Sequence, residues 1–196
     1  MLPRPVNVTE ANIVRVDRAP RGGVHLSDVI HHIRQRFDEK FKNALPGSEY
    51  HRWQIGLSWE AAALNKGLAY DLKEHHGHMF QQYQFEDDGI TMTADGVCPE
   101  CRLVWETKAT WFGTGRDITD PVFRFYIWQT QCYTRAAEFK TGRFVFAYMN
   151  GDYRVNRFPT YKAWDWTWSR AELDKTWSLI RRERDAMLLE REKTDA

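Results

Sequence analysis

A carboxylate and an ammonium group stand two residues apart in the chain, at Glu106 and Lys108. Side chains two apart in a strand share one face, so a strand over residues 103–110 would project both groups together. Asp95 ends an alternating run over residues 90–95, so a neighbouring strand can bring a second carboxylate to the same point. Two carboxylates and a lysine are the equipment for binding a hard divalent cation and directing water at a phosphodiester.

The elements that must position these groups are helices and strands in alternation. Residues 80–110 predict two or three antiparallel strands, with turns at residues 87–89 and 98–101. Residues 144–148 and 161–168 predict further strands, and the tryptophans of the second one, Trp164, Trp166 and Trp168, alternate onto one face that we expect to pack in the core.

Four helices are predicted from apolar spacing and capping residues. One begins after His25 with Ser27 as N-cap and ends before residues 46–47, and a second is capped by Ser58. A third opens at residues 120–121 and runs to about residue 140, where Gly142 closes it. The last opens with a capping box of Ser169 and Glu172.

The order of the chemical groups along the chain resembles the PD-(D/E)XK nuclease superfamily. Asp95 followed by Glu106-Thr-Lys108 matches its D, variable gap, ExK arrangement, although Ala94 stands where the superfamily often has proline. Two further pairs resemble motifs of the RecB-like and λ-exonuclease-like branch. They are Gly56 with Glu60 (GxxxE) and Gln129 with Tyr133 (QxxxY).

The resemblance implies an α/β fold with a restriction-endonuclease-like core, in which a central mixed, mostly antiparallel sheet is flanked by helices. Prolines and glycines punctuate residues 1–23, which predicts an N-terminal arm over residues 1–24 or a short edge strand at residues 13–16. Residues 25–196 are then expected to form one nuclease domain with a C-terminal strand and helix. The length of 196 residues and a hydrophobic content of 42% agree with one domain and a substantial core.

The resemblance further implies roles for the motif residues. Asp95 and Glu106 would hold Mg²⁺ or Mn²⁺, with the main-chain carbonyl of Thr107 and the side chain of Glu60 as additional ligands. Lys108 would orient and help deprotonate the attacking water, or offset negative charge on the phosphorus centre.

The glutamine and tyrosine of the QxxxY motif complete the set of implied catalytic residues. Gln129 and Tyr133 would tether the lysine, a water or the scissile phosphate. Phosphate contacts along the DNA are assigned to Arg116, Arg135 and Lys140.

Each of these motifs has a simpler interpretation. Glu106 and Lys108 could be an exposed ion pair. Glu60 could serve only to stabilise its helix, because a carboxylate near a helix N-terminus interacts favourably with the helix dipole. Gln129 and Tyr133 could be ordinary polar and core residues of a helix. Cys98 and Cys101 have metal-knuckle spacing, but the chain has three cysteines and no second pair. We therefore expect no iron-sulfur cluster and no zinc at Cys98 and Cys101.

The sequence thus predicts a divalent-metal-dependent DNA nuclease, with exonuclease action in recombination, repair or phage DNA processing as the first hypothesis. The alternatives are a structure-specific endonuclease for junctions or flaps, and a non-catalytic DNA-binding subunit of a recombination complex. DNA ends or single strands are the expected partners, with a second copy of the chain or a recombination protein also considered. Lacking a signal peptide or apolar membrane span, the protein is expected to be cytoplasmic.

Overall fold

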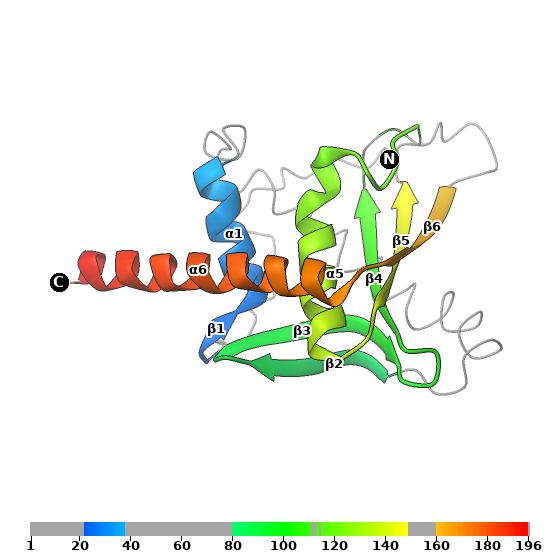
Figure 1. Ribbon diagram of the computed structural model, residues 1–196. Coiled ribbons are helices and arrows are strands. Elements are labelled where there is room, and N and C mark those ends of the chain that lie inside the picture. The colour runs from blue at the N-terminus through cyan, green and yellow to red at the C-terminus, as the bar shows by residue number, and fades with distance from the viewer. Residues whose placement is uncertain (1–21, 38–79, 111–112, 114, 149–159, 196) are drawn as a thin grey trace, which may run out of the picture.

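The computed structural model describes residues 22–37, 80–110, 113, 115–148 and 160–195 (Figure 1). Within these ranges, six strands form one mixed sheet in the order β1-β3-β4-β5-β6, with β2 paired to β3. The strands are β1 (Val24–His25), β2 (Phe80–Asp87), β3 (Ile90–Cys98), β4 (Leu103–Thr110), β5 (Thr141–Tyr148) and β6 (Thr160–Thr167).

Antiparallel pairing dominates the sheet. The pairs β2 with β3, β3 with β4, and β5 with β6 are antiparallel, whereas β1 with β3 and β4 with β5 are parallel. The predicted mixed, mostly antiparallel sheet is therefore confirmed.

In the described part of the chain, three α-helices pack on this sheet: α1 (Leu26–Phe37), α5 (Arg124–Ala136) and α6 (Arg170–Asp195). All three contribute to one apolar cluster with β3 and Val104 of β4, so they cover the same face. Figure 1 shows α5 lying along β4 and β5 and α6 crossing both α5 and α1. Among the described helices, none is long and apolar enough to cross a membrane.

Both predicted hairpin turns are present. The β2–β3 turn has Asp88 at φ 49° and Gly89 at φ 71°, the left-handed pair that a two-residue type I′ turn requires. In the β3–β4 turn the Arg102 N–H donates to the Pro99 carbonyl at 3.2 Å. These turns align β2, β3 and β4 so that the residues expected to do chemistry lie on adjacent strands.

Two of the predicted helix starts are confirmed by their caps. Asp120 accepts from the Val122 N–H at 3.1 Å and precedes a 3-10 turn, η3 (Pro121–Phe123), that leads into α5. Ser169 and Glu172 form the capping box of α6, with the Ser169 N–H donating to Glu172 Oε2 at 2.7 Å.

The predicted N-cap of the first helix was wrong. Ser27 lies inside α1, which begins at Leu26, and the carboxylate that accepts the His25 N–H at 3.4 Å belongs to Asp28. The second predicted helix, with Ser58 and Glu60, and the N-terminal arm up to residue 21 lie outside the described residues.

The predicted end of the third helix was also wrong. The α-helix ends at Ala136, and Glu138 takes the left-handed conformation at φ 57°. The Phe139 N–H donates to the Thr134 carbonyl and the Glu138 N–H to the Arg135 carbonyl, which is a Schellman motif with glutamate where glycine is usual. Without a glycine to mark it, this stop was not visible in the sequence.

Gly142, expected to close that helix, lies instead in β5 beneath it. A Cβ on this residue would stand 2.5 Å from Thr130 Cγ2 and 2.9 Å from the Trp168 ring. Thr130 belongs to α5 and Trp168 directly follows β6, and both side chains are buried. Glycine is therefore required here because α5 approaches the sheet more closely than any side chain would allow.

We predict that Gly142→Ala lowers the free energy of unfolding by about 1–3 kcal/mol, the usual cost of overpacking a core. The measurement is denaturant unfolding followed by circular dichroism. Gly113→Ala is the matched control, because a Cβ there meets nothing within 4 Å. Equal stability of the two variants would contradict the packing role of Gly142.

Candidate active site

The candidate site lies where β3 and β4 part. Their backbone pairing is confined to Gly96↔Trp105, Val97↔Val104 and Cys98↔Leu103. The edge of β3 that pairs with β4 near the end of the strand pairs with β1 at its beginning, through Ile90 and Thr91. Asp95 and Glu106 are thus the first residues beyond the last paired position, at the point where the two strands separate.

The Asp95 carboxylate spans this separation. Its Oδ2 accepts hydrogen bonds from the Thr107 N–H at 2.7 Å and the Thr107 Oγ1 hydroxyl at 2.9 Å. Asp95 is 6% exposed. Because the N–H and C=O of one strand residue point to the same side, the Thr107 carbonyl also faces β3 and Asp95. The Asp95 side chain therefore takes the place of a backbone acceptor for the Thr107 N–H. The same hydrogen bonds hold the carboxylate in position.

Glu106 and Lys108 lie on the helix-covered face of β4, next to Asp95. Lys108 Nζ is 2.6 Å from Glu106 Oε1 and 3.7 Å from Asp95 Oδ2, so one ammonium contacts both carboxylates. Glu106 is fully buried and the Lys108 side chain is 22% exposed. Burying such charges carries a desolvation cost, and concentrated buried charge is typical of functional sites.

The glutamine and tyrosine of the QxxxY motif face this cluster from α5. Gln129 Nε2 donates to the Tyr133 hydroxyl oxygen. Burial, followed by the negative charge of Glu106, raises the pKa of Tyr133 well above its ordinary value, and the Gln129 bond opposes this only in part. Tyr133 therefore stays a neutral phenol beside the carboxylates and acts as a hydrogen-bonding group.

The structure thus brings together Asp95, Glu106, Thr107, Lys108, Gln129 and Tyr133. Glu60 lies outside the described residues. Within the described ranges, no group of three or more His, Cys, Asp or Glu side chains is arranged to hold a metal ion. Within these ranges the carboxylate pair is therefore a two-residue site.

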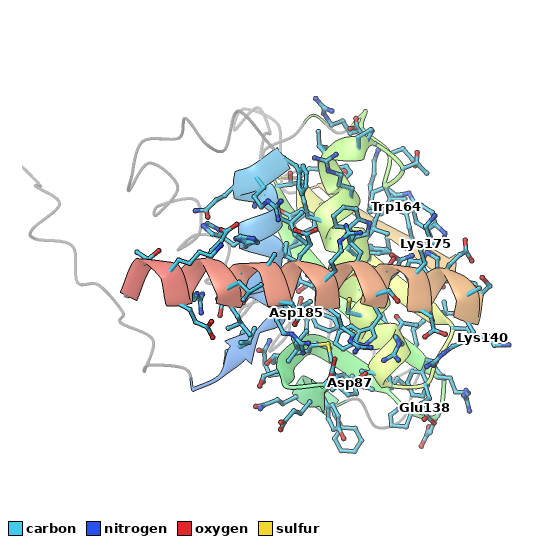
Figure 2. All side chains as sticks on the ribbon, turned by 60° about the vertical axis from the view of Figure 1, so that its left-hand side comes forward. Asp87, Glu138, Lys140, Trp164, Lys175 and Asp185 are labelled. Carbon is cyan, nitrogen blue, oxygen red and sulfur yellow. The ribbon has the colours of Figure 1, made fainter. Side chains whose placement is uncertain are left out.

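The three residues assigned to phosphate contacts occupy separate places. Arg116 follows β4, pairs with Asp120 at 2.6 Å, and accepts the Tyr148 hydroxyl through its carbonyl at the end of β5. Lys140 is exposed just before the start of β5 and projects outward (Figure 2). Arg116 and Lys140 therefore lie at opposite ends of β5.

Arg135 has an internal role in the fold. Its guanidinium pairs with Asp87 of β2 and with Asp174 of α6, and lies 5.1 Å from the centre of the Trp177 ring. These contacts tie the β2–β3 hairpin to α5 and α6. No local pattern signals these ion pairs, because the partners of Arg135 are 48 and 39 residues away in the chain.

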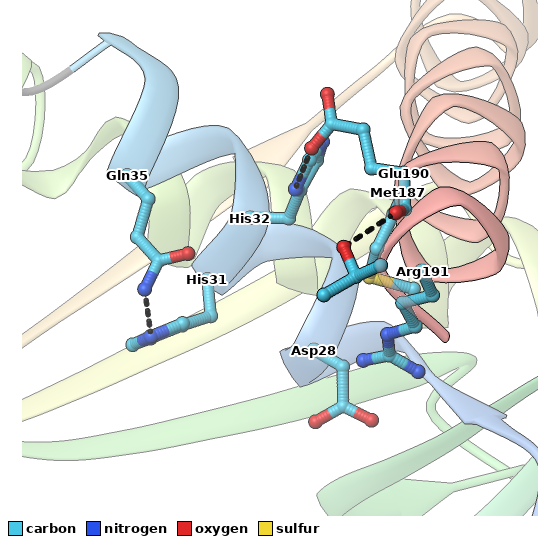
Figure 3. Close-up of a pocket in the computed structure, with 8 residues that line it drawn as sticks. Asp28, His31, His32, Gln35, Met187, Glu190 and Arg191 are labelled. Carbon is cyan, nitrogen blue, oxygen red and sulfur yellow. Dashed lines mark hydrogen bonds and ion pairs between the residues drawn. The ribbon is translucent and has the colours of Figure 1, made fainter. Parts of the chain in front are cut away.

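One cavity among the described residues lies away from this cluster. A cleft of about 420 Å³ lies between α1 and the end of α6, lined by Asp28, His31, His32, Glu190 and Arg191 among others (Figure 3). Its side chains mix both signs of charge, and His32 Nδ1 stands 3.8 Å from Glu190. Neither Asp95 nor Glu106 lines this cleft, so we place the candidate site where β3 and β4 separate.

Two residues that contact the cluster were not singled out for these contacts by sequence reasoning. Thr107 was expected only as a carbonyl ligand, yet its N–H and hydroxyl both hold Asp95. Tyr126, three residues before Gln129, places its ring 5.8 Å from Lys108 Nζ. The spacing of three residues on a helix was the available signal for Tyr126.

Comparisons with known proteins find structural neighbours. An alkaline exonuclease, LHK-Exo from Laribacter hongkongensis, superposes with a TM-score of 0.53 at 19% identity, over 89% of this chain and 94% of that one. The same enzyme in complex with dAMP gives 0.54 at 18% identity, over the same shares. A phage-related exonuclease from Haemophilus somnus 129PT gives 0.50 at 12% identity, over 84% of this chain and 82% of that one.

The chain therefore has the α/β fold of the alkaline and phage-related exonucleases. These neighbours agree with the λ-exonuclease-like branch of the PD-(D/E)XK superfamily that the motifs resemble. No protein-family model matches the sequence, and no curated protein matches it. At such identities the likeness establishes the fold, so the activity has to be argued from the site.

The cysteines at the β3–β4 turn lie at the paired end of these strands, where Cys98 packs with Leu103, Trp105 and Val145. Cys98 is buried, Cys101 is exposed, and the Cys101 N–H donates to Cys98 Sγ at 3.4 Å. Desolvation, together with the neighbouring Cys98 thiol, raises the pKa of Cys101 to about 11. Burial raises the pKa of Cys132, which lies inside α5. The absence of zinc and of an iron-sulfur cluster stays a prediction.

We predict that Cys101 is the one thiol that reacts with an aromatic disulfide reagent in the native protein, because Cys98 and Cys132 are buried. Only the thiolate reacts, so the rate should rise about tenfold per pH unit through pH 10 and level off near the pKa of about 11. Stopped-flow absorbance measures it, with Cys101→Ser as the control. A plateau near pH 9 would contradict the raised pKa.

Proposed function

We propose that this protein is a divalent-metal-dependent deoxyribonuclease that hydrolyses phosphodiester bonds, acting as an exonuclease on DNA ends in recombination, repair or phage DNA processing. One observation carries the proposal. The Lys108 ammonium is shared between two buried carboxylates, 2.6 Å from Glu106 and 3.7 Å from Asp95. The exonuclease fold of the neighbours supports it, and one neighbour was solved with a deoxynucleotide.

The donor set fits Mg²⁺ or Mn²⁺. Asp95, Glu106 and the Thr107 carbonyl offer hard oxygen atoms, the ligand type that both ions prefer. The two carboxylates are close enough to share one cation, since a single ammonium contacts both. Glu60 would add a fourth oxygen donor. When bound, such an ion would supply Lewis-acid stabilisation of the phosphate and a more acidic water.

Lys108 then acts as a charge-stabilising group. In the ion pair shown it is an ammonium, which donates protons in hydrogen bonds and offsets negative charge as it develops on the phosphate oxygens. The base role would require the neutral amine, which the contact with two carboxylates disfavours. The electrostatic role is therefore the one that this arrangement supports.

Thr107, Gln129 and Tyr133 hold the groups of the site in fixed positions through hydrogen bonds. Thr107 holds the Asp95 carboxylate through two hydrogen bonds, so that the carboxylate cannot turn toward solvent. The Tyr133 oxygen accepts from Gln129, which leaves its own proton available to a phosphate or water oxygen. Fixed donors of this kind lower the reorganisation needed as the transition state forms.

We predict that Glu106→Gln and Lys108→Met each lower the cleavage rate of end-labelled linear DNA by about 10²–10⁴-fold, because each removes a charge that acts on the transition state. Glu192→Gln and Lys175→Met, at exposed positions of α6, are the matched controls and should keep the wild-type rate. Thermal melting establishes first that each variant is folded. Undiminished cleavage by both site variants would refute the proposed mechanism.

The substrate form separates the proposed exonuclease from its alternatives. Linear duplex, linear single-stranded and circular DNA are compared in Mg²⁺ and in Mn²⁺. Cleavage confined to linear DNA supports the exonuclease. Cleavage of circular or branched DNA would replace it by a structure-specific endonuclease, and DNA binding without cleavage would replace it by a non-catalytic subunit. Light scattering of the same samples tests whether a second copy of the chain is required.

We also predict that Tyr133→Phe lowers the turnover rate by about tenfold with little change in DNA affinity, because one fixed hydrogen bond is lost while the ring remains. Since the pKa of Tyr133 is raised, its ionisation should not limit the rate of the wild-type protein below pH 10. The pH dependence of turnover in both proteins measures this. A wild-type rate that falls near pH 10, with no such fall in the variant, would contradict it.

A further inference from the structure

The ring of Tyr126 is part of the environment of Lys108. Tyr126, Gln129 and Tyr133 stand at positions i, i+3 and i+7 of α5, so all three side chains lie on one face of the helix. The Lys108 Nζ is 5.8 Å from the centre of the Tyr126 ring. The same nitrogen is 2.6 Å from Glu106, so the ammonium contacts a carboxylate and an aromatic ring together.

The Tyr126 ring is held firmly from the side away from solvent. Phe146 meets it edge-on with ring centres 6.0 Å apart, and Phe123 lies at 6.5 Å. Phe146 is also the β5 residue in register with Lys108 of β4, so the lysine stem and the ring share one neighbour. The backbone is fixed as well, because the Tyr126 carbonyl accepts from Thr130 Oγ1 at 2.9 Å.

A lysine needs such support more than the carboxylates do. Its ammonium sits on a flexible four-carbon stem, and the Lys108 side chain is 22% exposed, so solvent competes for it. An aromatic ring attracts a cation by its electrostatic quadrupole without accepting an N–H in the way a carboxylate does. The ring can therefore hold the ammonium while its N–H donors stay directed at Glu106, Asp95 and a substrate oxygen.

We propose that Tyr126 is a positioning residue of this site, whose aromatic ring holds the Lys108 ammonium at the carboxylate pair by a cation–π contact. The inference rests on the proposed nuclease function for its consequence in turnover. The contact itself does not depend on that function. The property that matters is the electron density of the ring, and the hydroxyl of Tyr126 is dispensable.

The test replaces Tyr126 by phenylalanine and by phenylalanines with increasing fluorination, which changes the ring quadrupole while nearly keeping its shape. Tyr126→Phe should keep turnover within about twofold, and turnover should then fall progressively with each added fluorine. Tyr126→Leu should lose between about twofold and about thirtyfold, the range that a cation–π contact spans from exposed to desolvated sites. KM for DNA should change little, because the substitution disturbs the position of Lys108, which acts on charge that develops during the reaction.

The control applies the same fluorinated residues at Tyr83, an exposed position of β2, where turnover should not change. A purely structural role for Tyr126 would leave turnover unaffected by fluorination, because the variants pack alike. That outcome, or equal turnover in Tyr126→Leu and wild type, would overturn the inference.

A second measurement uses the metal-free protein and needs no activity. The ring current of Tyr126 should displace the NMR signals of the Lys108 ε-methylene protons, and Tyr126→Leu should return them toward ordinary lysine values. Unchanged signals would overturn the contact. If the wild-type protein cuts no DNA while the displacement is present, the proposed function fails and the Tyr126–Lys108 contact stands. If cleavage is normal and the displacement is absent, the inference alone fails.

Discussion

The separation of β3 from β4 beyond Gly96 and Trp105 is the constraint on which the site depends. Continued pairing would use the Thr107 N–H in the sheet and leave no space between the strands. Instead the Asp95 carboxylate accepts that N–H at 2.7 Å, so a side chain completes the hydrogen bonding of the strand edge. One interaction therefore satisfies the backbone and also places an acid beside Glu106.

The position of α5 is the second requirement, and Gly142 determines it. Because this residue has no Cβ, Thr130 and Trp168 can close over β5, and the helix lies directly on the sheet. Thr130 shares α5 with Tyr126, Gln129 and Tyr133, so close packing at Thr130 sets the height of this helix above the sheet and the position of the Tyr126 ring beside Lys108. A single buried glycine thus connects the packing of the core to the geometry of the site.

Local patterns predicted the strands and the cluster well, and tertiary contacts account for what they missed. The alternation around Glu106 and the Asp88-Gly89 turn are properties of a few residues, and both appear as expected. The stop at Glu138 depends on a left-handed glutamate that sequence does not signal. The ion pairs of Arg135 with distant acids and the buried contacts of Gly142 arise only when the helices meet the sheet.

The charge of the cluster itself favours a further cation. Two carboxylates share one ammonium, so the three groups carry one uncompensated negative charge, and Glu106 is fully buried. Coulomb interactions are stronger in a buried site, where the effective dielectric constant is lower than in water, so this excess would favour a bound cation. An added divalent ion would make the cluster net positive, which is the sign that binds a phosphodiester. Under the proposed function, the same burial that costs stability would prepare the site first for a cation and then for DNA.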